Sequence, residues 1–175
     1  MSGPFDLSGK VAVITGSSRG IGRAIALRMA EAGARVVVSS RKQAACAVVV
    51  AELDQAHGAG RALAVAASLS SRDDLKALVA RTEAAFGRID ILVCNAASNP
   101  YAGPMSGISD EQFRKVLDNN VLANHWLIQL ALPALERDGG GAVVIVSSIG
   151  GLQGSPVLGA YNISKAADMQ LARNL

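Results

Sequence analysis

The stretch that decides the fold is VAVITGSSRGIG, residues 11–22. The β-branched run 11–14 predicts a buried strand, and the apolar spacing of residues 21–32 predicts a helix that stops at Gly33. Between them, glycines allow a tight turn that a pyrophosphate can approach closely, and the helix start offers free N–H groups. A turn without a ligand is the alternative, but a glycine turn between strand and helix favours dinucleotide binding. The residues expected to bind the phosphates are Gly16, Ser18, Arg19, Gly20, Ile21 and Gly22.

Outward from this unit, apolar strands and helices alternate to the end of the chain. Further strands are expected at 35–39, 62–67, 90–94 and 142–148, and helices at 42–57, 71–86, 109–137 and beyond the Gly/Pro-rich stretch 150–159. Ser109 and Gln112 form a capping box, and Pro133 should kink or end the long helix. The pattern predicts an α/β fold with a doubly wound parallel sheet, in one domain over residues 1–175.

Composition excludes several classes of protein. Half of the residues are hydrophobic and 18% are charged, which excludes a disordered chain, and no apolar run is long enough to cross a membrane. The formal net charge of +3 comes from scattered arginines and is accompanied by six aromatic residues, so we expect no nucleic-acid partner. The two cysteines and two histidines lack metal-ligand spacing, so no metal is expected. The first ten residues hold no apolar signal segment, and we therefore expect a cytoplasmic protein.

A second group of residues near the end of the chain carries chemistry. Tyr161 and Lys165 are four residues apart and share one helix face. Ser148 ends the expected fifth strand, at the sheet edge where ligands bind in open α/β sheets. A free tyrosine has a pKa near 10 and is a poor base at neutral pH, but a neighbouring ammonium group favours the phenolate. The grouping therefore predicts acid–base chemistry at Tyr161.

Together, the glycine spacing, the serine and the Tyr-x-x-x-Lys motif resemble the short-chain dehydrogenase/reductase family, from about Leu7 to the end of the chain. The resemblance implies a Rossmann-like fold in which Tyr161 exchanges a proton with a carbonyl or alcohol oxygen and Ser148 holds that oxygen. It also implies that Lys165 tunes Tyr161 and bonds the nicotinamide ribose. Asn120 aligns with the fourth catalytic residue, which holds a water on the proton path. Asn119 is the competing register, and a solvated helix face is the alternative for both asparagines.

The expected cofactor is NADP rather than NAD. The second strand is followed by Ser40 and Arg41, with no acid to bind a ribose 2′-hydroxyl, and guanidinium groups at Arg19 and Arg41 suit a 2′-phosphate. The alternative is two merely exposed arginines. Where the family usually has an adenine-binding Asp, this chain has Ser68-Leu69, and Ser68 can still bond the adenine amino group. Further cofactor contacts are expected from Asn95 and Ala96, with Ser98 replacing a family glycine, and from Tyr161 and Lys165.

Within the family, the chain resembles the dehydrogenase/reductase member 4 type of NADP-dependent carbonyl reductase. The 3-oxoacyl carrier-protein reductases and gluconate dehydrogenases are near alternatives. Family members add two more strands and a substrate loop beyond this length, so we expect a C-terminally truncated chain whose full-length form is a dimer or tetramer. The expected function is NADP-dependent interconversion of a small-molecule carbonyl and an alcohol. The alternative is a non-catalytic dinucleotide-binding fragment that acts through subunit assembly.

Overall fold

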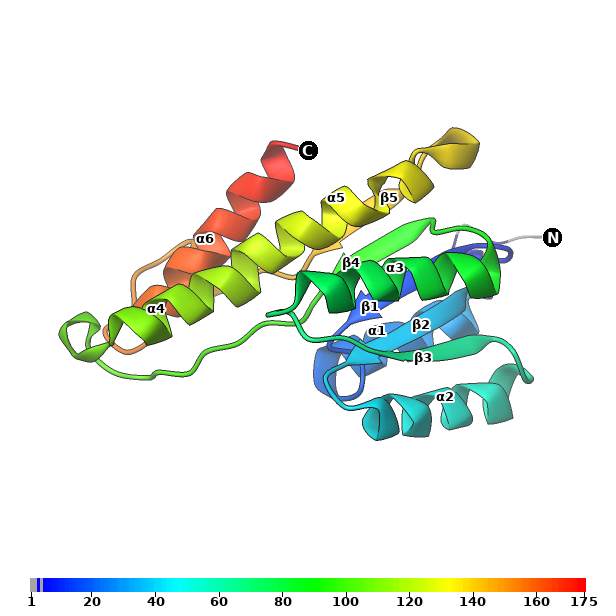
Figure 1. Ribbon diagram of the computed structural model, residues 1–175, viewed down its shortest axis with the longest axis horizontal. Helices are drawn as coiled ribbons and strands as arrows, with labels where there is room; N and C mark the ends of the chain where they lie inside the picture. Colours follow the sequence, from blue (N-terminus) through cyan, green and yellow to red (C-terminus); the bar gives the residue numbers. More distant parts are fainter. Residues whose placement is uncertain (1–2, 4) are drawn as a thin grey trace.

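A parallel sheet forms the centre of the molecule in the computed structural model, which describes residue 3 and residues 5–175. Its strand order is β3-β2-β1-β4-β5, so the chain starts in the middle and winds outward in both directions (Figure 1). Every pairing is parallel, and β1 is buried along its whole length. The strands are β1 Val11–Thr15, β2 Arg35–Ser40, β3 Ala62–Ala66, β4 Ile91–Cys94 and β5 Ala142–Ile145. The predicted fold class is confirmed.

Helices cover both faces of this sheet. On one face, Ala26 of α1 and Leu53 of α2 pack on Ile14 and its neighbours. On the other face, Leu78 of α3 and Leu127 of α5 pack on the opposite side of β1, β2 and β4. The helices are α1 Gly20–Glu31, α2 Gln43–His57, α3 Arg72–Phe86, α4 Asp110–Leu117, α5 Ala123–Leu135 and α6 Gly159–Arg173. The layers place the carboxyl ends of β1, β2 and β4 at one edge, beside the start of α1.

The long helix expected at 109–137 is present as one helical rod over residues 110–135, but its hydrogen-bond pattern changes partway along (Figure 1). The capping box at Ser109 is present and α4 begins behind it, but a π-helical segment, Asp118–Leu122, separates α4 from α5. Asn119 and Asn120 in this segment are buried and bond to other elements through their side chains. The wider π turn brings both side-chain amides inward. The periodicity of apolar residues in the sequence gives no sign of such a turn. Pro133 lies in α5, which ends two residues later.

The expected fifth strand at 142–148 is too long, since β5 ends at Ile145. The Val146 N–H still donates to the Cys94 carbonyl of β4 (3.0 Å), and beyond it the chain bonds to α6. The Val146 carbonyl accepts from Lys165 Nζ (2.8 Å), and Ser147 Oγ donates to the Lys165 carbonyl (2.8 Å). Ser148 then caps a single 3-10 turn, Ile149–Gly151. Ser148 therefore lies three residues past the strand and is held by the turn.

The described residues offer neither a membrane-spanning helix nor a cluster of metal ligands. Within residues 3 and 5–175, no helix is long and apolar enough to cross a bilayer. The same residues contain no group of three His, Cys, Asp or Glu side chains that could hold a metal ion. The expectation about the first ten residues rests partly on Met1, Ser2 and Pro4, which lie outside the described part of the chain.

Candidate active site

The loop between β1 and α1 requires glycine at several positions. Gly16 and Gly20 have φ angles of +66° and +58°, which side chains disfavour. A Cβ on Gly22 would lie 2.5 Å from the Gly16 carbonyl oxygen, closer than real contacts allow. Arg19 precedes α1 without a side-chain cap, and the first turn of α1 carries no acid. The start of this helix therefore presents N–H groups and a positive dipole end to an anion.

Two hydroxyl groups that sequence reasoning missed hold this loop in place. Thr15 Oγ1 accepts from the N–H groups of Asn95 (3.0 Å) and Ala96 (3.1 Å). Asn95 Nδ2 donates back to the Thr15 carbonyl (2.8 Å). Ser17 Oγ donates to Ile14 O (2.6 Å) and accepts from the Ser39 N–H (2.9 Å). These bonds join the ends of β1, β2 and β4 into one rigid rim.

A cleft of about 990 Å³ lies along this rim. It brings together twelve of the residues expected to bind a cofactor: Gly16, Ser18, Arg19, Gly20, Ile21, Gly22, Ser40, Arg41, Ser68, Leu69, Asn95 and Ala96. Its wall also includes Lys42 and Lys115, which were not among the expected site residues, and Asn119, which was expected only as the competing register for Asn120. The remaining two expected contacts, Tyr161 and Lys165, lie outside this lining on α6.

The charge of the cleft has one sign. Among the described residues that line it, four are cationic, Arg19, Arg41, Lys42 and Lys115, and none is acidic. Arg41 and Lys42 are exposed at the end of β2, beside Ser40, and Arg19 is exposed in the glycine loop. Such a cleft attracts an anionic ligand.

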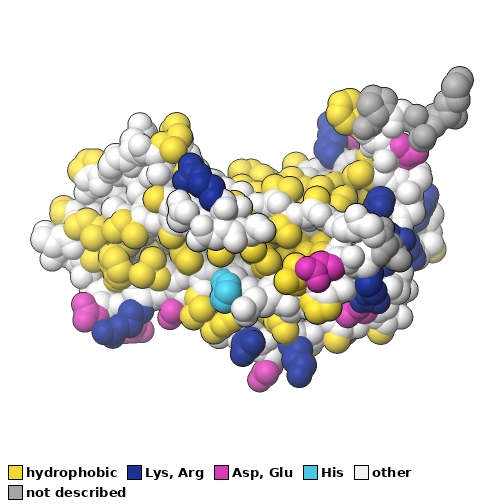
Figure 2. Space-filling view, turned by 90° about the horizontal axis from the view of Figure 1, so that it is seen from above, with side chains coloured by type: hydrophobic (Ala, Val, Ile, Leu, Met, Phe, Trp, Pro, Cys, Tyr) yellow, Lys and Arg dark blue, Asp and Glu magenta, His cyan; other side chains and the backbone are white. Residues whose placement is uncertain are grey.

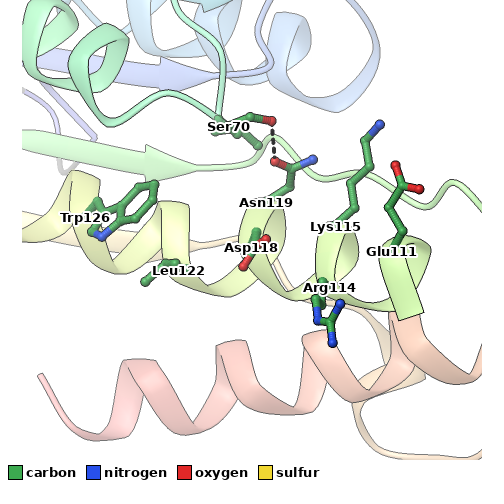
Figure 3. Close-up of a pocket in the computed structure, with 9 residues that line it drawn as sticks. Ser70, Glu111, Arg114, Lys115, Asp118, Asn119, Leu122 and Trp126 are labelled. Carbon is green, nitrogen blue, oxygen red and sulfur yellow. Dashed lines mark hydrogen bonds between the residues drawn. The ribbon is translucent and has the colours of Figure 1, made fainter. Parts of the chain in front are cut away.

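A second pocket of about 500 Å³ adjoins the cleft and shares Lys115 and Asn119 with it. Figure 3 shows Lys115 and Glu111 extending from α4 on the side that faces Ser70. Ser70 Oγ donates to Asn119 Oδ1 (2.8 Å), which ties the β3–α3 loop to the π-helical segment (Figure 3). This link forms part of the wall between the two hollows.

The tyrosine and lysine of the motif lie together on α6. Lys165 is 2% exposed, Tyr161 is half-buried, and Lys165 Nζ lies 5.8 Å from the centroid of the Tyr161 ring. The turn that begins at Ser148 packs against the same helix. The packing is so close that a Cβ on Gly150 would lie 2.3 Å from the Asn162 side chain. Ser148 Oγ accepts from the Gly150 N–H (3.1 Å). The three residues thus lie on two elements in direct contact.

Asn120 is fully buried, so the alternative of a solvated helix face is wrong for this residue. Its Oδ1 accepts from the Ser98 N–H (2.7 Å), and its Nδ2 donates to Ser98 O and Ser164 Oγ (both 3.0 Å). Ser164 Oγ donates in turn to the Tyr161 carbonyl (2.7 Å). Asn119 is also buried, and its Nδ2 donates to Ser98 Oγ (3.0 Å). Ser98, which replaces a family glycine, therefore anchors both asparagines.

The sequence prediction missed two buried polar residues beside this group, Asn124 and Asp168. Asp168 Oδ2 accepts from Lys165 Nζ (2.8 Å) and Asp168 Oδ1 accepts from Asn124 Nδ2 (3.0 Å). The signal was available, since Asp168 is three residues after Lys165 and Asn124 is four after Asn120, each on the same helix face. Burial raises the pKa of the nearby Cys94 thiol to about 12, the Asp168 charge acts in the same direction, and Lys165 opposes both.

Fold and cleft together define the class of protein: a Rossmann-like domain with a glycine-lined, basic site at the topological switch point of its sheet. The family model for short chain dehydrogenases matches residues 10–175. The chain belongs to the short-chain dehydrogenase family.

Several curated proteins are similar to this chain. Dehydrogenase/reductase SDR family member 4 of Rattus norvegicus is 44% identical over 169 residues, which are 96% of this chain and 60% of the rat protein. The Homo sapiens member 4 is 43% identical over 172 residues, with 97% and 60% covered. The mitochondrial member 2 of Homo sapiens is 41% identical over 170 residues, with 97% and 59% covered. The chain therefore spans about 60% of the length of these relatives.

Solved structures share the same fold. A 7α-hydroxysteroid dehydrogenase complexed with NADH and 7-oxo glycochenodeoxycholic acid has a TM-score of 0.92 and 36% identity, covering 97% of this chain and 65% of that one. A short-chain type dehydrogenase/reductase from Mycobacterium marinum has a TM-score of 0.90 and 34% identity, covering 97% and 69%.

Proposed function

We propose that the protein is an NADP-dependent oxidoreductase that interconverts a carbonyl and an alcohol through Ser148, Tyr161, Lys165 and Asn120. The observation that carries the proposal is the placement of a buried Lys165 beside the Tyr161 ring, on the helix that packs against the Ser148 turn. Membership of the short-chain dehydrogenase family supports the reaction class.

The described residues fit a dinucleotide. Substituting Gly16 or Gly22 would fill the cradle with a Cβ that meets Asn95 or the Gly16 backbone. The uncapped start of α1 suits a pyrophosphate, and Ser68 and Leu69 line the cleft where an adenine is expected. Arg19 and Arg41, without an acid in the lining, favour NADP over NAD. When bound, the nicotinamide supplies or accepts the hydride.

Four residues of the chain would then handle the substrate oxygen and its proton. Tyr161 gives the proton of its phenol to a carbonyl oxygen during reduction and takes a proton from the alcohol during oxidation. Ser148 Oγ binds the same oxygen and orients it. Lys165 places its ammonium group beside the Tyr161 ring and would bond the nicotinamide ribose, and Asn120 braces α6 through Ser164.

Replacement of one hydroxyl tests the proposal. The protein in its natural full length is assayed for NADPH consumption with a panel of ketones and diketones, alongside Tyr161→Phe. This variant keeps the ring and removes the proton donor, so we expect kcat to fall about 10²–10⁴-fold, the range of general acid–base catalysis. Wild-type turnover in the variant contradicts the assignment. Nucleotide binding by a protein that reduces none of the panel favours the alternative, a non-catalytic binding fragment.

Two broader expectations belong to the same proposal. The homo-oligomer expected for the full-length protein stays a prediction. In the 175-residue chain, Figure 2 shows hydrophobic side chains gathered on the face that carries α5, β5 and α6. Light scattering on the full-length protein measures its mass. The cytoplasmic location stays a prediction, tested by cell fractionation.

A further inference from the structure

We propose that Asp168 and Asn124 are positioning residues that hold Lys165 and Asn120 in register with each other. This inference rests on the proposed function above, in which those two residues are catalytic. The bonds form one chain from α6 to the π-helical segment: Lys165 Nζ to Asp168 (2.8 Å), Asp168 to Asn124 Nδ2 (3.0 Å), and Asn124 Nδ2 to the Asn120 carbonyl (2.6 Å).

Lys165 uses two of its three N–H donors on groups of the protein. An ammonium group has three donors, and Lys165 Nζ uses one on Asp168 Oδ2 and one on the Val146 carbonyl. These two acceptors come from α6 and from the end of β5, so they fix the nitrogen from two sides. The third N–H remains for the tyrosine or a ligand, and Asp168 decides where it points.

The asparagine explains the π-helical segment. In this segment the backbone bonds run one residue further than in an α-helix, as shown by the Ala123 N–H bonding to the Asp118 carbonyl. The Asn120 carbonyl in the same segment accepts the side-chain amide of Asn124 at 2.6 Å. The same amide also reaches Asp168, so one side chain couples the two helices.

This network is a poor choice for stability alone. Lys165, Asp168 and Asn124 are each at most 2% exposed, and desolvating such a group is unfavourable unless its bonds are complete. Among the described residues, Asn124 Oδ1 is buried without a hydrogen-bond partner. A half-satisfied polar cluster in the core is less stable than apolar packing, which points to a functional reason for it.

The test uses Asp168→Asn in the full-length protein, with Asp110→Asn as the matched control. Asp110 is also a helical carboxylate with a basic neighbour, Arg114, but it is exposed and does not line the cleft. Asp168→Asn keeps the shape and removes the charge that fixes Lys165. Misplacing a catalytic group by about 1 Å costs up to about 10²-fold. We expect kcat to fall about 10- to 100-fold with the carbonyl KM within about threefold of wild type.

A second readout does not depend on turnover. NADPH titrated by fluorescence should bind about three- to tenfold more weakly to Asp168→Asn, because the third N–H of Lys165 no longer points into a fixed direction. Asp110→Asn should match wild type in both kcat and affinity. A folded Asp168→Asn protein with wild-type kcat and wild-type NADPH affinity overturns the proposal.

Asn124→Ala provides an independent variant. Alanine suits a helix, and the change removes an amide whose oxygen has no partner, so we expect this protein to fold even where Asp168→Asn does not. We expect kcat, measured well below the melting temperature, to fall about three- to tenfold. The melting temperature should fall as well, because Asp168 Oδ1 and the Asn120 carbonyl lose the Asn124 amide as a donor. A wild-type kcat in this variant contradicts the positioning role. If instead Tyr161→Phe keeps its turnover, the proposed function fails, while the NADPH titrations still decide the role of Asp168.

Discussion

Charged side chains lie at both ends of the parallel strands, but they do different things at the carboxyl and the amino ends. At the carboxyl edge, Arg19 and Arg41 line a cleft whose described wall holds no acid. At the amino edge, Asp90 is buried and accepts from the Val11 N–H (2.9 Å) and from the Arg88 guanidinium. The arginines at the carboxyl edge can therefore bind an anionic ligand. The Asp90 carboxylate at the amino edge is instead bonded within the protein, where it holds the start of β1.

Arg41 should decide between the two nicotinamide cofactors. A guanidinium group bonded to a 2′-phosphate contributes about 1.5–3 kcal/mol, the range for hydrogen bonds to charged groups. Arg41→Ala should weaken NADPH binding by about this amount and leave NADH nearly unchanged. Fluorescence titration of both cofactors measures the difference, with Arg61→Ala as an exposed control outside the cleft lining. Equal losses for the two cofactors speak against the assignment.

Asp90 should stabilise the fold in a pH-dependent way. Burial acts to raise the pKa of its carboxyl, but the hydrogen bonds from Arg88, Val11 and Lys10 hold it below the ordinary value of 3.8. The charged form is therefore favoured in the folded state, so its contribution is present above the ordinary value and is lost as the pH falls through the lowered one. Asp90→Asn should cost about 1–3 kcal/mol in urea unfolding at neutral pH, and the cost should shrink in acid. The exposed Asp73→Asn change is the control, and a cost that stays constant into acid contradicts the charge argument.

At the scale of elements, the predicted helices and strands match the observed ones where apolar periodicity and turn residues determine them. The first unit, residues 11–31, was predictable because a β-branched run, three glycines and an apolar helix face all indicate the same arrangement. The π-helical segment could not be predicted from the sequence, because it accompanies side-chain bonds from Asn119 and Asn120 to residues far along the chain. The end of β5 was misjudged for the same reason, since the Ala96 N–H bonds to Thr15 Oγ1 and the Val146 carbonyl accepts from Lys165, a residue far along the chain.

Gly22 tests whether the first unit acts as a ligand cradle. A methyl group at this position would lie 2.5 Å from the backbone oxygen of Gly16, so the loop has to move. Gly22→Ala should therefore weaken NADPH binding more than tenfold, about 1.4 kcal/mol, while the far-UV circular dichroism spectrum keeps its α/β shape. Gly154→Ala is the matched control, because nothing lies within 4 Å of its added methyl. Equal NADPH affinities in both variants would count against the cradle.

At the scale of the whole molecule, the candidate site depends on elements distant in sequence. The cleft draws on the ends of β1, β2, β3 and β4, which the alternating pattern places at one edge. That edge could be predicted, and twelve expected residues line it. The link between Lys165 and Asn120 could not, because it depends on how α6 lies against the π-helical segment, a packing that neither element encodes alone.

The outer strand of the sheet carries the last prediction. β5 pairs with β4, and within residues 3 and 5–175 no strand pairs with its other side. Val144 is in register with Val93, but it is 46% exposed where Val93 is 1% exposed, so its apolar face is uncovered at an open edge. Such an edge recruits other chains, and a lysine on it opposes that pairing.

The 175-residue chain should therefore elute above its monomer mass on size exclusion, and Val144→Lys should shift it towards the monomer. Val48→Lys, a change on α2 at a residue 70% exposed, is the control. An equal shift in both variants attributes the effect to net charge, and a monomeric wild-type chain refutes the edge argument.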